Sequence, residues 1–525
     1  NKTPIMSLPQ SNTHTSLMRQ MSLNLVTKLG IFIANILVGL WLVPYLIRNL
    51  GVAGYGLIPL ATQLTSYIGL LSIGINGAIS RYLTINIQAG EIDKAKKTFN
   101  SAFFSITVLS IVLIPCTLIF SYYVPSIFEV NLNLYNDTRL LFALILGMFV
   151  IGAWGTIFTV SPYSLNRLDL LNGIELVNVS IRIALLVSLF TMMTPRLYHV
   201  GIAYFSSAII ALFLSTLLWR KLTPQLVIRF ADFNRKELKN LTATSGWLII
   251  NQIGTLLFLN IDLIAANKLF GVTAGGRYAA VLQWSVLLRS MAAMLSEVIT
   301  PVILTYFAKN ERDRMINLSK FAVKIMSIGM ALPIGIICGV SYPLLTIWLG
   351  IDYRELAPLM IIMVSHLIIN LSVLPLFSIN IAYNKVRIPG WMSLIMGLGN
   401  VILVVLFSKN GWGLYGIALS GAIMLTLKNT FFIPLYTSSI LNISRLTYIR
   451  AMSPGFCSAV LICLISFSIS NFFSISNWVD LIFSSALIGI AYTIFIWFVI
   501  LSREERRMIY SLIPIKPFRN NGEMV

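Results

Sequence analysis

Apolar residues dominate the sequence in runs of roughly 18 to 25 residues, separated by short polar segments. Runs of this length are typical of transmembrane helices and are too long for most helices buried in a soluble core. They predict fourteen helices, in groups of six, six and two. The predicted ranges are 24–47, 57–80, 101–121, 140–161, 171–193, 200–219, 244–267, 278–303, 320–342, 358–380, 390–407, 412–435, 453–473 and 478–501.

Short motifs recur between the first and second group of six helices. The pairs offset by 220 residues are Gly51-Val52 with Gly271-Val272 and Glu91-x-Asp93 with Glu311-x-Asp313. The pairs offset by 218 are Pro115 with Pro333, Pro125 with Pro343, and Asn166-Arg167 with Asn384-Lys385. A duplicated membrane bundle has a natural cleft between its halves, which is where many transporters hold their cargo.

The pattern therefore predicts an all-α polytopic membrane protein with two pseudo-symmetric lobes and an additional C-terminal helical pair. The predicted parts are a polar cytoplasmic N-terminus (1–22), an N-terminal six-helix lobe (23–225), a basic cytoplasmic linker (226–243), a C-terminal six-helix lobe (244–440), an extra transmembrane hairpin (453–501) and a cytoplasmic tail (502–525).

Charge supports this topology. Only 11% of the residues are charged, 57% are hydrophobic, and the formal net charge is +20. The termini and even-numbered loops hold 26 Lys and Arg residues, and the odd-numbered loops hold 7. Because positive loops stay on the cytoplasmic side during insertion, both termini are predicted to be cytoplasmic. The basic balance is explained by topology and needs no nucleic acid partner.

Catalytic signatures are missing from the sequence. It contains no phosphate-binding glycine loop with a Lys, no nucleophile elbow and no HExxH motif. The four cysteines and three histidines show no metal-ligand spacing. The sequence therefore favours a transporter without a cofactor or metal over an ATP-driven pump or a membrane hydrolase.

Two arginines near the middle of predicted helices are the principal site candidates, because a charge in the bilayer core usually faces a protein-lined or wet cavity. Arg182 shares a helix face with Glu175 and Asn178, at the spacing i, i+3, i+7. Arg289 lies eight residues before Glu297. Each arginine is predicted either to be neutralised by a neighbouring acid or to bind phosphate oxygens through its planar fork of donors.

Other polar residues in the helices are weaker candidates. Lys28 and Asn35 belong to one polar stripe of the first helix, where Lys28 either guides an anion or extends to the membrane interface. Lys428 has the same ambiguity in the twelfth helix. These three residues, with Arg182, Arg289 and Asn178, form the predicted substrate-binding set.

A second set of residues contains candidates for ion coupling. Glu175, Glu297 and Asp262 are carboxylates within predicted helices, and His366 titrates near neutral pH when it is unperturbed. Asp262 either pairs with a cation or is solvated at the outer end of its helix. His366 lies one turn before Asn370 and either titrates or is a hydrogen-bonded packing residue. Coupling to H⁺, to Na⁺ or to the membrane potential stays open at this point.

The first 100 residues carry a family likeness. The segments VPYLIRNLGVAGYG, LLSIGINGAISRYL and QAGEIDKAKK resemble the polysaccharide transporter branch of the multidrug, oligosaccharidyl-lipid and polysaccharide (MOP) exporter superfamily, and look most like O-antigen and capsule flippases of the Wzx type. The resemblance implies the two-lobed MATE/MOP fold in a bacterial inner membrane. It also implies a role in lipopolysaccharide or capsule biosynthesis, beside polymerase and chain-length regulator proteins.

The cargo that this resemblance implies is an undecaprenyl-diphosphate-linked oligosaccharide, moved from the cytoplasmic to the outer leaflet by alternating access. Many relatives place an acid before the glycine of the second helix, whereas this chain has Leu71-Ser72-Ile73-Gly74, so a role for that acid does not transfer. The alternatives are a cation-coupled multidrug exporter, a non-transporting membrane scaffold and a membrane-embedded glycosyl-carrier transferase. Arginines and lysines outnumber acids within the helices, which favours an anionic cargo.

Overall fold

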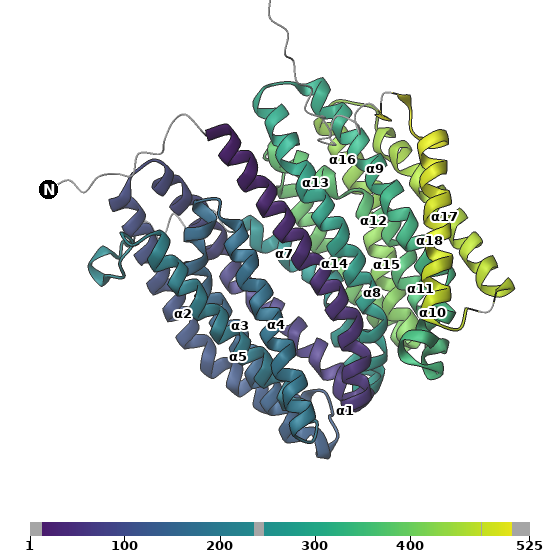
Figure 1. Cartoon of the computed structure of the whole chain (residues 1–525), viewed down its shortest axis with the longest axis horizontal. Helices are drawn as coiled ribbons and strands as arrows, with labels where there is room; N and C mark the ends of the chain where they lie inside the picture. The colour runs from purple at the N-terminus through teal and green to yellow at the C-terminus, as the bar shows by residue number, and fades with distance from the viewer. Residues whose placement is uncertain (1–12, 236–245, 474, 504, 507–525) are drawn as a thin grey trace, which may run out of the picture. The chain divides into compact units, whose positions relative to one another are not determined.

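The computed structural model describes residues 13–235, 246–473, 475–503 and 505–506 (Figure 1). These residues are helical apart from turns and short loops, and they include no strand. Twelve helices among them are long and apolar enough to cross a membrane. The predicted class, an all-α polytopic membrane protein, is confirmed.

The difference between twelve spans and fourteen predicted helices comes from two kinked helices. Helix α1 (Thr13–Gln88) continues through Gly51, which has φ 73° and ψ 169°. Helix α8 (Ile261–Ala308) continues through Gly271, with φ 83° and ψ 166°. Only glycine adopts a positive φ of this kind without a steric penalty from a Cβ atom. Each long helix therefore has two arms, and the fourteen predicted segments coincide with helical backbone apart from their ends and single-residue breaks.

The backbone repeats where the sequence repeats. Gly51 and Gly271 have nearly the same dihedral angles. Glu91 and Glu311 precede α2 (Ile92–Ile127) and α9 (Arg312–Gly339) with φ, ψ of −81°, 63° and −85°, 65°. Asn166 and Asn384 both have a positive φ, 56° and 53°. The duplication predicted from the motifs is thus confirmed in local geometry.

The chain divides into two compact units. The first contains residues 1–283 and 387–424, and the second contains residues 284–386 and 425–525. Two of the three unit boundaries fall inside α8 and α15, and the third lies just before α14. They differ from the boundaries of the two predicted six-helix lobes. The predicted division into lobes stays a prediction.

The first unit is a helical bundle in which α3 packs against both α2 and α5 (Figure 1). Helix α4 packs against α5, and α14 packs against α7. Besides α1 and α2, its helices are α3 (Tyr135–Ser164), α4 (Leu168–Met192), α5 (Leu197–Leu222), α7 (Gly246–Leu259), the first part of α8, α14 (Arg387–Lys409), most of α15 (Gly413–Leu427), and the short helices η1 (Leu132–Leu134) and η2 (Phe230–Asp232).

Close backbone contact joins the two kinked helices just beyond their kinks. Gly56 and Gly276 are related by the same offset of 220 residues and pack against each other. A Cβ added at Gly56 would lie 2.6 Å from the backbone nitrogen of Gly276, and one at Gly276 would collide with the carbonyl oxygen of Val52. Small residues allow membrane helices to approach this closely, so that van der Waals contact holds them together where lipid offers no hydrophobic driving force.

The second unit is organised around α9 and α17, which form its most extensive helix pair. The contact again uses small residues, since a Cβ on Gly335 of α9 would lie 2.8 Å from Ile462 of α17. Besides α9, the elements of this unit are the second part of α8, α10 (Ser341–Leu349), η3 (Ile351–Leu356), α11 (Ala357–Ser365), α12 (Leu367–Ser372), α13 (Leu374–Ala382), η4 (Lys428–Phe432), α16 (Ile433–Ile440), α17 (Thr447–Phe472), α18 (Trp478–Phe495) and η5 (Ile496–Ile500). The first helix of the C-terminal hairpin, α17, is therefore part of the core of this unit, whereas α18 is mostly exposed.

Two spans of the second unit are interrupted where polar residues gather. Helices α11, α12 and α13 form one span with breaks at His366 and Val373, and Pro375 just after the second break lacks the N–H that would continue the ladder. Between α15 and α16 the chain forms one turn of π-helix, residues 428–432, before Pro434. Such turns often occur at functional sites.

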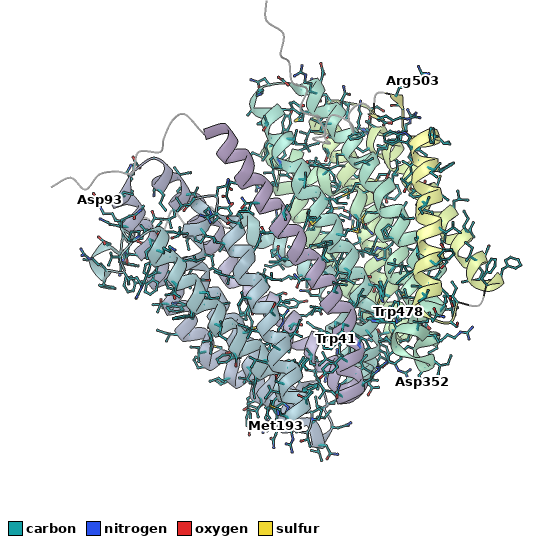
Figure 2. All side chains as sticks on the ribbon, viewed as in Figure 1. Trp41, Asp93, Met193, Asp352, Trp478 and Arg503 are labelled. Atoms are coloured by element: carbon teal, nitrogen blue, oxygen red, sulfur yellow. The ribbon has the colours of Figure 1, made fainter. Side chains whose placement is uncertain are left out.

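The predicted loops alternate between the two sides of the membrane, and the positions of the helix ends are consistent with this alternation. In the first unit, Figure 2 places Asp93 and Met193 at opposite ends of the helices. In the second unit it places Arg503 at one end and Asp352 with Trp478 at the other. Which end is cytoplasmic stays a prediction.

The contact between Gly56 and Gly276 gives a stability prediction. Gly56→Ala should lower the free energy of unfolding by about 1–3 kcal/mol, because the new methyl group forces the backbones apart. We expect the midpoint of thermal unfolding in detergent to fall by several degrees. Gly30→Ala in the same helix is the control, since a Cβ there meets nothing within 4 Å and alanine favours the helix. Equal midpoints for both variants would contradict the assigned contact.

Candidate functional site

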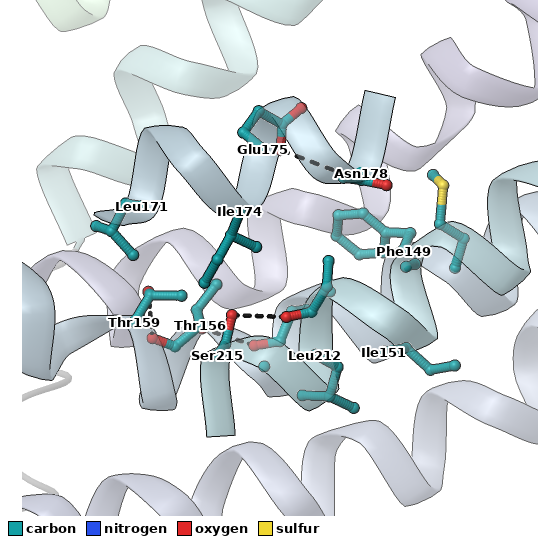
Figure 3. A pocket seen from close by; sticks show the side chains of 16 residues that line it. Phe149, Ile151, Thr156, Thr159, Leu171, Ile174, Glu175, Asn178, Leu212 and Ser215 are labelled. Carbon is teal, nitrogen blue, oxygen red and sulfur yellow. Dashed lines mark hydrogen bonds between the residues drawn. The ribbon is translucent and has the colours of Figure 1, made fainter. Parts of the chain in front are cut away.

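A cavity of about 550 Å³ lies within the first unit, between α3, α4 and α5. Its walls are mostly apolar, and its polar lining includes Thr156, Thr159, Glu175, Asn178 and Ser215. Figure 3 shows Glu175 and Asn178 on one side and the three hydroxyl side chains on the other. The structure thus brings two of the predicted site residues, Glu175 and Asn178, to one cavity.

The polar stripe predicted along one face of α4 is confirmed. Asn178 Nδ2 donates to Glu175 Oε2 at 3.4 Å, while Asn178 Oδ1 is buried without a hydrogen-bond partner. Arg182 lies one turn further along α4 and is partly buried. Its guanidinium carbon lies 4.6 Å from the centre of the Tyr204 ring on α5. A cation over an aromatic face is attracted by the ring quadrupole, which orients the guanidinium.

Arg182 has no acidic partner among the described residues. Its Nε is buried and makes no hydrogen bond. A carboxylate such as Glu175 was one predicted means of neutralising this charge, but Glu175 bonds to Asn178 instead. The guanidinium therefore keeps an unsatisfied donor one helical turn beyond Asn178, which lines the cavity, and a planar fork of donors suits an anionic ligand.

Asp262 lies at a break between helices in the first unit, just after Asn260 separates α7 from α8. Tyr278 donates its hydroxyl to Asp262 Oδ2 at 3.3 Å, and Asn400 Nδ2 donates to Oδ1 at 3.2 Å. Asn400 Nδ2 also donates to the Leu257 carbonyl at 3.1 Å, and its Oδ1 is buried without a partner. Asp262 is half-buried, and its carboxylate belongs to a partly buried hydrogen-bond network. Its role in ion coupling stays a prediction.

The second unit contains a polar network of His366, Asn370, Thr426 and Asn429, at the helix interruptions described above. Asn370 Nδ2 lies 2.7 Å from His366 Nδ1 and 3.3 Å from Thr426 Oγ1, and Asn429 Nδ2 donates to Asn370 Oδ1 at 2.8 Å. The hydrogen-bonded role predicted for His366 is confirmed. Its availability for titration stays a prediction.

Two predicted cations adjoin this network. Arg289 on α8 is close enough to His366 to interact with it electrostatically. Lys428 is 4% exposed, begins the π-helical turn and has its Nζ 5.8 Å from the centre of the Phe377 ring. Lys428 is therefore buried within the protein, and its predicted role stays a prediction. The second unit thus gathers Arg289, His366 and Lys428.

The three remaining candidates have exposed side chains. Lys28 and Asn35 are exposed on the first arm of α1, and Glu297 is exposed on α8, two turns beyond Arg289. Their roles stay predictions. Arg182 and Arg289 belong to different compact units, so their action on one cargo group also stays a prediction.

Sequence reasoning missed the partners of the charged residues. Tyr204 contacts Arg182, and Tyr278 and Asn400 contact Asp262. Thr426 and Asn429 contact Asn370, which lies beside His366. Apart from Tyr204 and Tyr278, these partners lie more than 50 residues away along the chain. Asn400 was detectable only as a polar residue inside an apolar run, a weak signal. The other contacts could be recognised only from the positions of the residues in the structure.

Comparison with solved structures defines the class of protein. The lipid II flippase MurJ in an inward closed conformation superposes with a TM-score of 0.62 at 14% identity, covering 91% of this chain and 99% of that one. An inward-facing multidrug resistance MATE family transporter of the MOP superfamily gives 0.59 at 15% identity, covering 83% and 98%. The chain therefore has the fold of the MOP superfamily transporters.

The chain belongs to the family described as polysaccharide biosynthesis protein, whose model matches residues 24–307. It is also 29% identical over 489 residues to the uncharacterized membrane protein EpsK of Bacillus subtilis (strain 168), covering 93% of this chain and 97% of the relative. The assignment from sequence motifs to the polysaccharide transporter branch of the MOP superfamily is confirmed.

Lys324, a cation within a predicted helix but outside the candidate sites, is neutralised by an acid. Lys324 on α9 donates to both carboxylate oxygens of Glu505, at 2.9 and 2.8 Å, and to the Ile500 carbonyl at 3.2 Å. Burial raises the pKa of Glu505, but hydrogen bonds from Lys324 and from the Ser502 backbone outweigh it, so the pKa lies below its ordinary value of 4.5. This ion pair fastens the start of the C-terminal tail to α9.

Glu505→Gln should therefore lower the free energy of unfolding by about 1 kcal/mol at neutral pH. Because the folded-state pKa is depressed, this stabilisation is complete above the ordinary value of 4.5 and is lost as the pH falls through the lowered pKa. Thermal unfolding of both proteins across this range should show the difference shrinking with acid. Glu311→Gln, which breaks an exposed pair with Arg314, is the control and should change little. A difference independent of pH would contradict the linkage.

Proposed function

We propose that this protein is a flippase that moves an undecaprenyl-diphosphate-linked oligosaccharide repeat unit from the cytoplasmic to the outer leaflet by alternating access. Membership of the polysaccharide biosynthesis family and the MOP transporter fold support a membrane transporter of lipid-linked polysaccharide precursors. The protein acts in this proposal as a transporter without enzymatic activity. Its substrate is the lipid-linked glycan, and its medium is the bilayer.

The observation that carries this proposal is the environment of Arg182. Placing an ionised side chain at the centre of a bilayer costs roughly 3 kcal/mol even on insertion scales. No acid in the part of the chain that the structure describes neutralises Arg182, and its buried Nε lacks an acceptor there. A diphosphate supplies several anionic oxygens in the geometry that a guanidinium binds best. Cargo binding would thus satisfy donors that the protein leaves unsatisfied.

The cations of the second unit extend the proposal. Arg289 and the buried Lys428 would stabilise the same anionic head at another stage of transport, and Lys28 and Asn35 would guide it towards the bundle. The polyprenyl tail has no need of a polar path and would remain in lipid. Only the diphosphate and the glycan have to cross through protein.

The membrane potential favours this direction of transport. With the cytoplasm negative, moving roughly two negative charges outward gains about 4.6 kcal/mol per 100 mV. We place the protein in the bacterial cytoplasmic membrane with both termini cytoplasmic, because of the loop charges. Polysaccharide polymerase and chain-length regulator proteins would then act on the exported units.

Replacement of Arg182 tests the proposed function. Arg182→Ala should reduce export of the lipid-linked glycan by about tenfold or more, because a charge-assisted hydrogen bond to phosphate is lost. Arg182→Lys should retain part of the activity, since it keeps the charge and loses the planar fork. The measurement is the fraction of lipid-linked oligosaccharide on the inner leaflet of a flippase-deficient strain carrying each variant.

Arg220→Ala is the matched control, because Arg220 lies exposed in the last turn of α5. It should leave export unchanged at equal protein levels in the membrane. Full complementation by Arg182→Ala would refute the assigned role.

We assign cation coupling to Asp262. Its carboxylate, the unpartnered Oδ1 of Asn400 and the nearby Leu257 carbonyl give an oxygen-rich environment at a helix break. Oxygen ligands of this kind suit hard cations, and broken membrane helices commonly coordinate coupling ions. Either Na⁺ or H⁺ would fit a single carboxylate.

Asp262→Asn tests this coupling. In proteoliposomes, wild-type transport should accelerate when a Na⁺ or H⁺ gradient is imposed, and the variant should lose that acceleration while retaining basal transport. Asp93→Asn, which removes an exposed carboxylate paired with Lys96, should behave like the wild type. A gradient response that survives Asp262→Asn would exclude this residue.

A cation-coupled multidrug exporter is the alternative within the same fold. An unneutralised guanidinium beside the cavity would repel an organic cation, which weighs against this reading. Export of a lipophilic cation such as ethidium, with no change in the lipid-linked glycan pool of deficient cells, would favour it. A scaffold without transport activity would affect neither cargo.

A further inference from the structure

The cavity between α3, α4 and α5 has a chemical character that the proposed function does not explain. A binding site for a diphosphate alone would need donors, and the donors beside this cavity belong to Arg182. The polar atoms that line the cavity itself are mostly acceptors. The ligand group that enters it must therefore bring hydrogen-bond donors.

The hydroxyl protons of the lining are already used. Thr156, Thr159 and Ser215 each donate to a backbone carbonyl of their own helix, at 2.7, 2.7 and 2.8 Å. The oxygen atoms of Thr159 and Ser215 remain as acceptors. Glu175 contributes a carboxylate, and Asn178 contributes the buried Oδ1 that has no partner.

The helix register orders these groups along the cavity. Helices α4 and α5 are joined by residues 193–196 and run antiparallel. Ala208 and Ala211 of α5 line the cavity together with Glu175 and Asn178, and such small side chains leave its space open. One turn further along each helix, Arg182 meets Tyr204. The anion-binding guanidinium therefore lies at one end of a chamber lined by acceptors.

We infer that this cavity is a saccharide subsite that holds the sugar residue attached to the diphosphate, while Arg182 holds the diphosphate itself. The inference rests on the proposed function. A sugar brings several hydroxyl donors to a small volume, and 550 Å³ lies within the range of small-molecule sites. The apolar walls pack against the C–H faces of the ring. An ammonium group would also satisfy the acceptors, but Arg182 one turn away opposes it.

Two binding probes separate the subsite from the proposed function. They are undecaprenyl diphosphate and undecaprenyl diphosphate carrying a single N-acetylhexosamine, each titrated into the full-length protein in nanodiscs. The sugar should tighten binding by about tenfold, the equivalent of one or two net hydrogen bonds. Arg182→Ala should weaken both probes equally.

Filling the cavity should abolish only the contribution of the sugar. Gly152 lines the cavity, and a Cβ there meets nothing within 4 Å, so Gly152→Leu adds bulk without a backbone clash. We expect it to bind both probes with the affinity that wild type shows for the bare diphosphate. Glu175→Gln, which turns one acceptor into a donor, should lose several-fold in the affinity for the sugar-bearing probe alone.

Gly173→Leu is the matched control. Gly173 lies exposed on α4 outside the cavity lining, and its Cβ position is equally open. This variant should bind the sugar-bearing probe more tightly than the bare diphosphate, by the same factor as the wild type. A sugar effect that survives Gly152→Leu would overturn the subsite and leave the flippase proposal intact.

Other outcomes separate the two proposals further. Failure of the wild type to bind either diphosphate would overturn the proposed function and the subsite together. Binding of ethidium that Gly152→Leu blocks, with no effect of the sugar, would overturn the saccharide assignment in favour of an organic cation.

Discussion

The cost of desolvating charge governs how this protein uses its few ionisable residues. Inside a bilayer, each such group needs a counter-charge, a set of hydrogen-bond partners or a cavity. Lys324 obtains a carboxylate from the C-terminal tail, and Asp262 obtains a hydroxyl and an amide. Arg182 has a ring face and lies one turn from a cavity, but no acid of the described ranges pairs with it. The first two arrangements are satisfied within the protein, whereas the third still has donors to offer to a ligand.

Close helix packing through small residues is the framework on which these sites depend. In lipid, helices gain no hydrophobic free energy by associating, so contact between backbones has to hold them. Gly56 against Gly276 and Gly335 against Ile462 are contacts of this kind. The same use of small residues opens space elsewhere, since Ala208 and Ala211 line the cavity opposite the polar stripe of α4. Small side chains thus allow close contact between helices at some positions and leave space for a cavity at others.

The two halves of the duplication differ in the continuity of corresponding helices. In the first half, α3 and α5 are continuous helices beside a cavity with a polar stripe. The corresponding spans of the second half are interrupted at His366 and at residues 428–432. The side-chain amides of Asn370 and Asn429 form a hydrogen bond beside these interruptions. Regular helices provide fixed walls, whereas broken ones provide polar groups at membrane depth.

The sequence by itself determined the class of fold, because bilayer thickness sets the length of apolar runs and a repeated motif requires a repeated backbone. Gly51 and Gly271 show this most clearly, since a positive φ restricts the choice of residue. The sequence also placed Glu175, Asn178 and Arg182 on one helix face, because the helical period is fixed. Only the tertiary structure decided which charges are neutralised. The carboxylate that pairs with Lys324 is 181 residues away, and Asn400, one of the two partners of Asp262, is 138 residues away. Local periodicity carries no information about such distant neighbours.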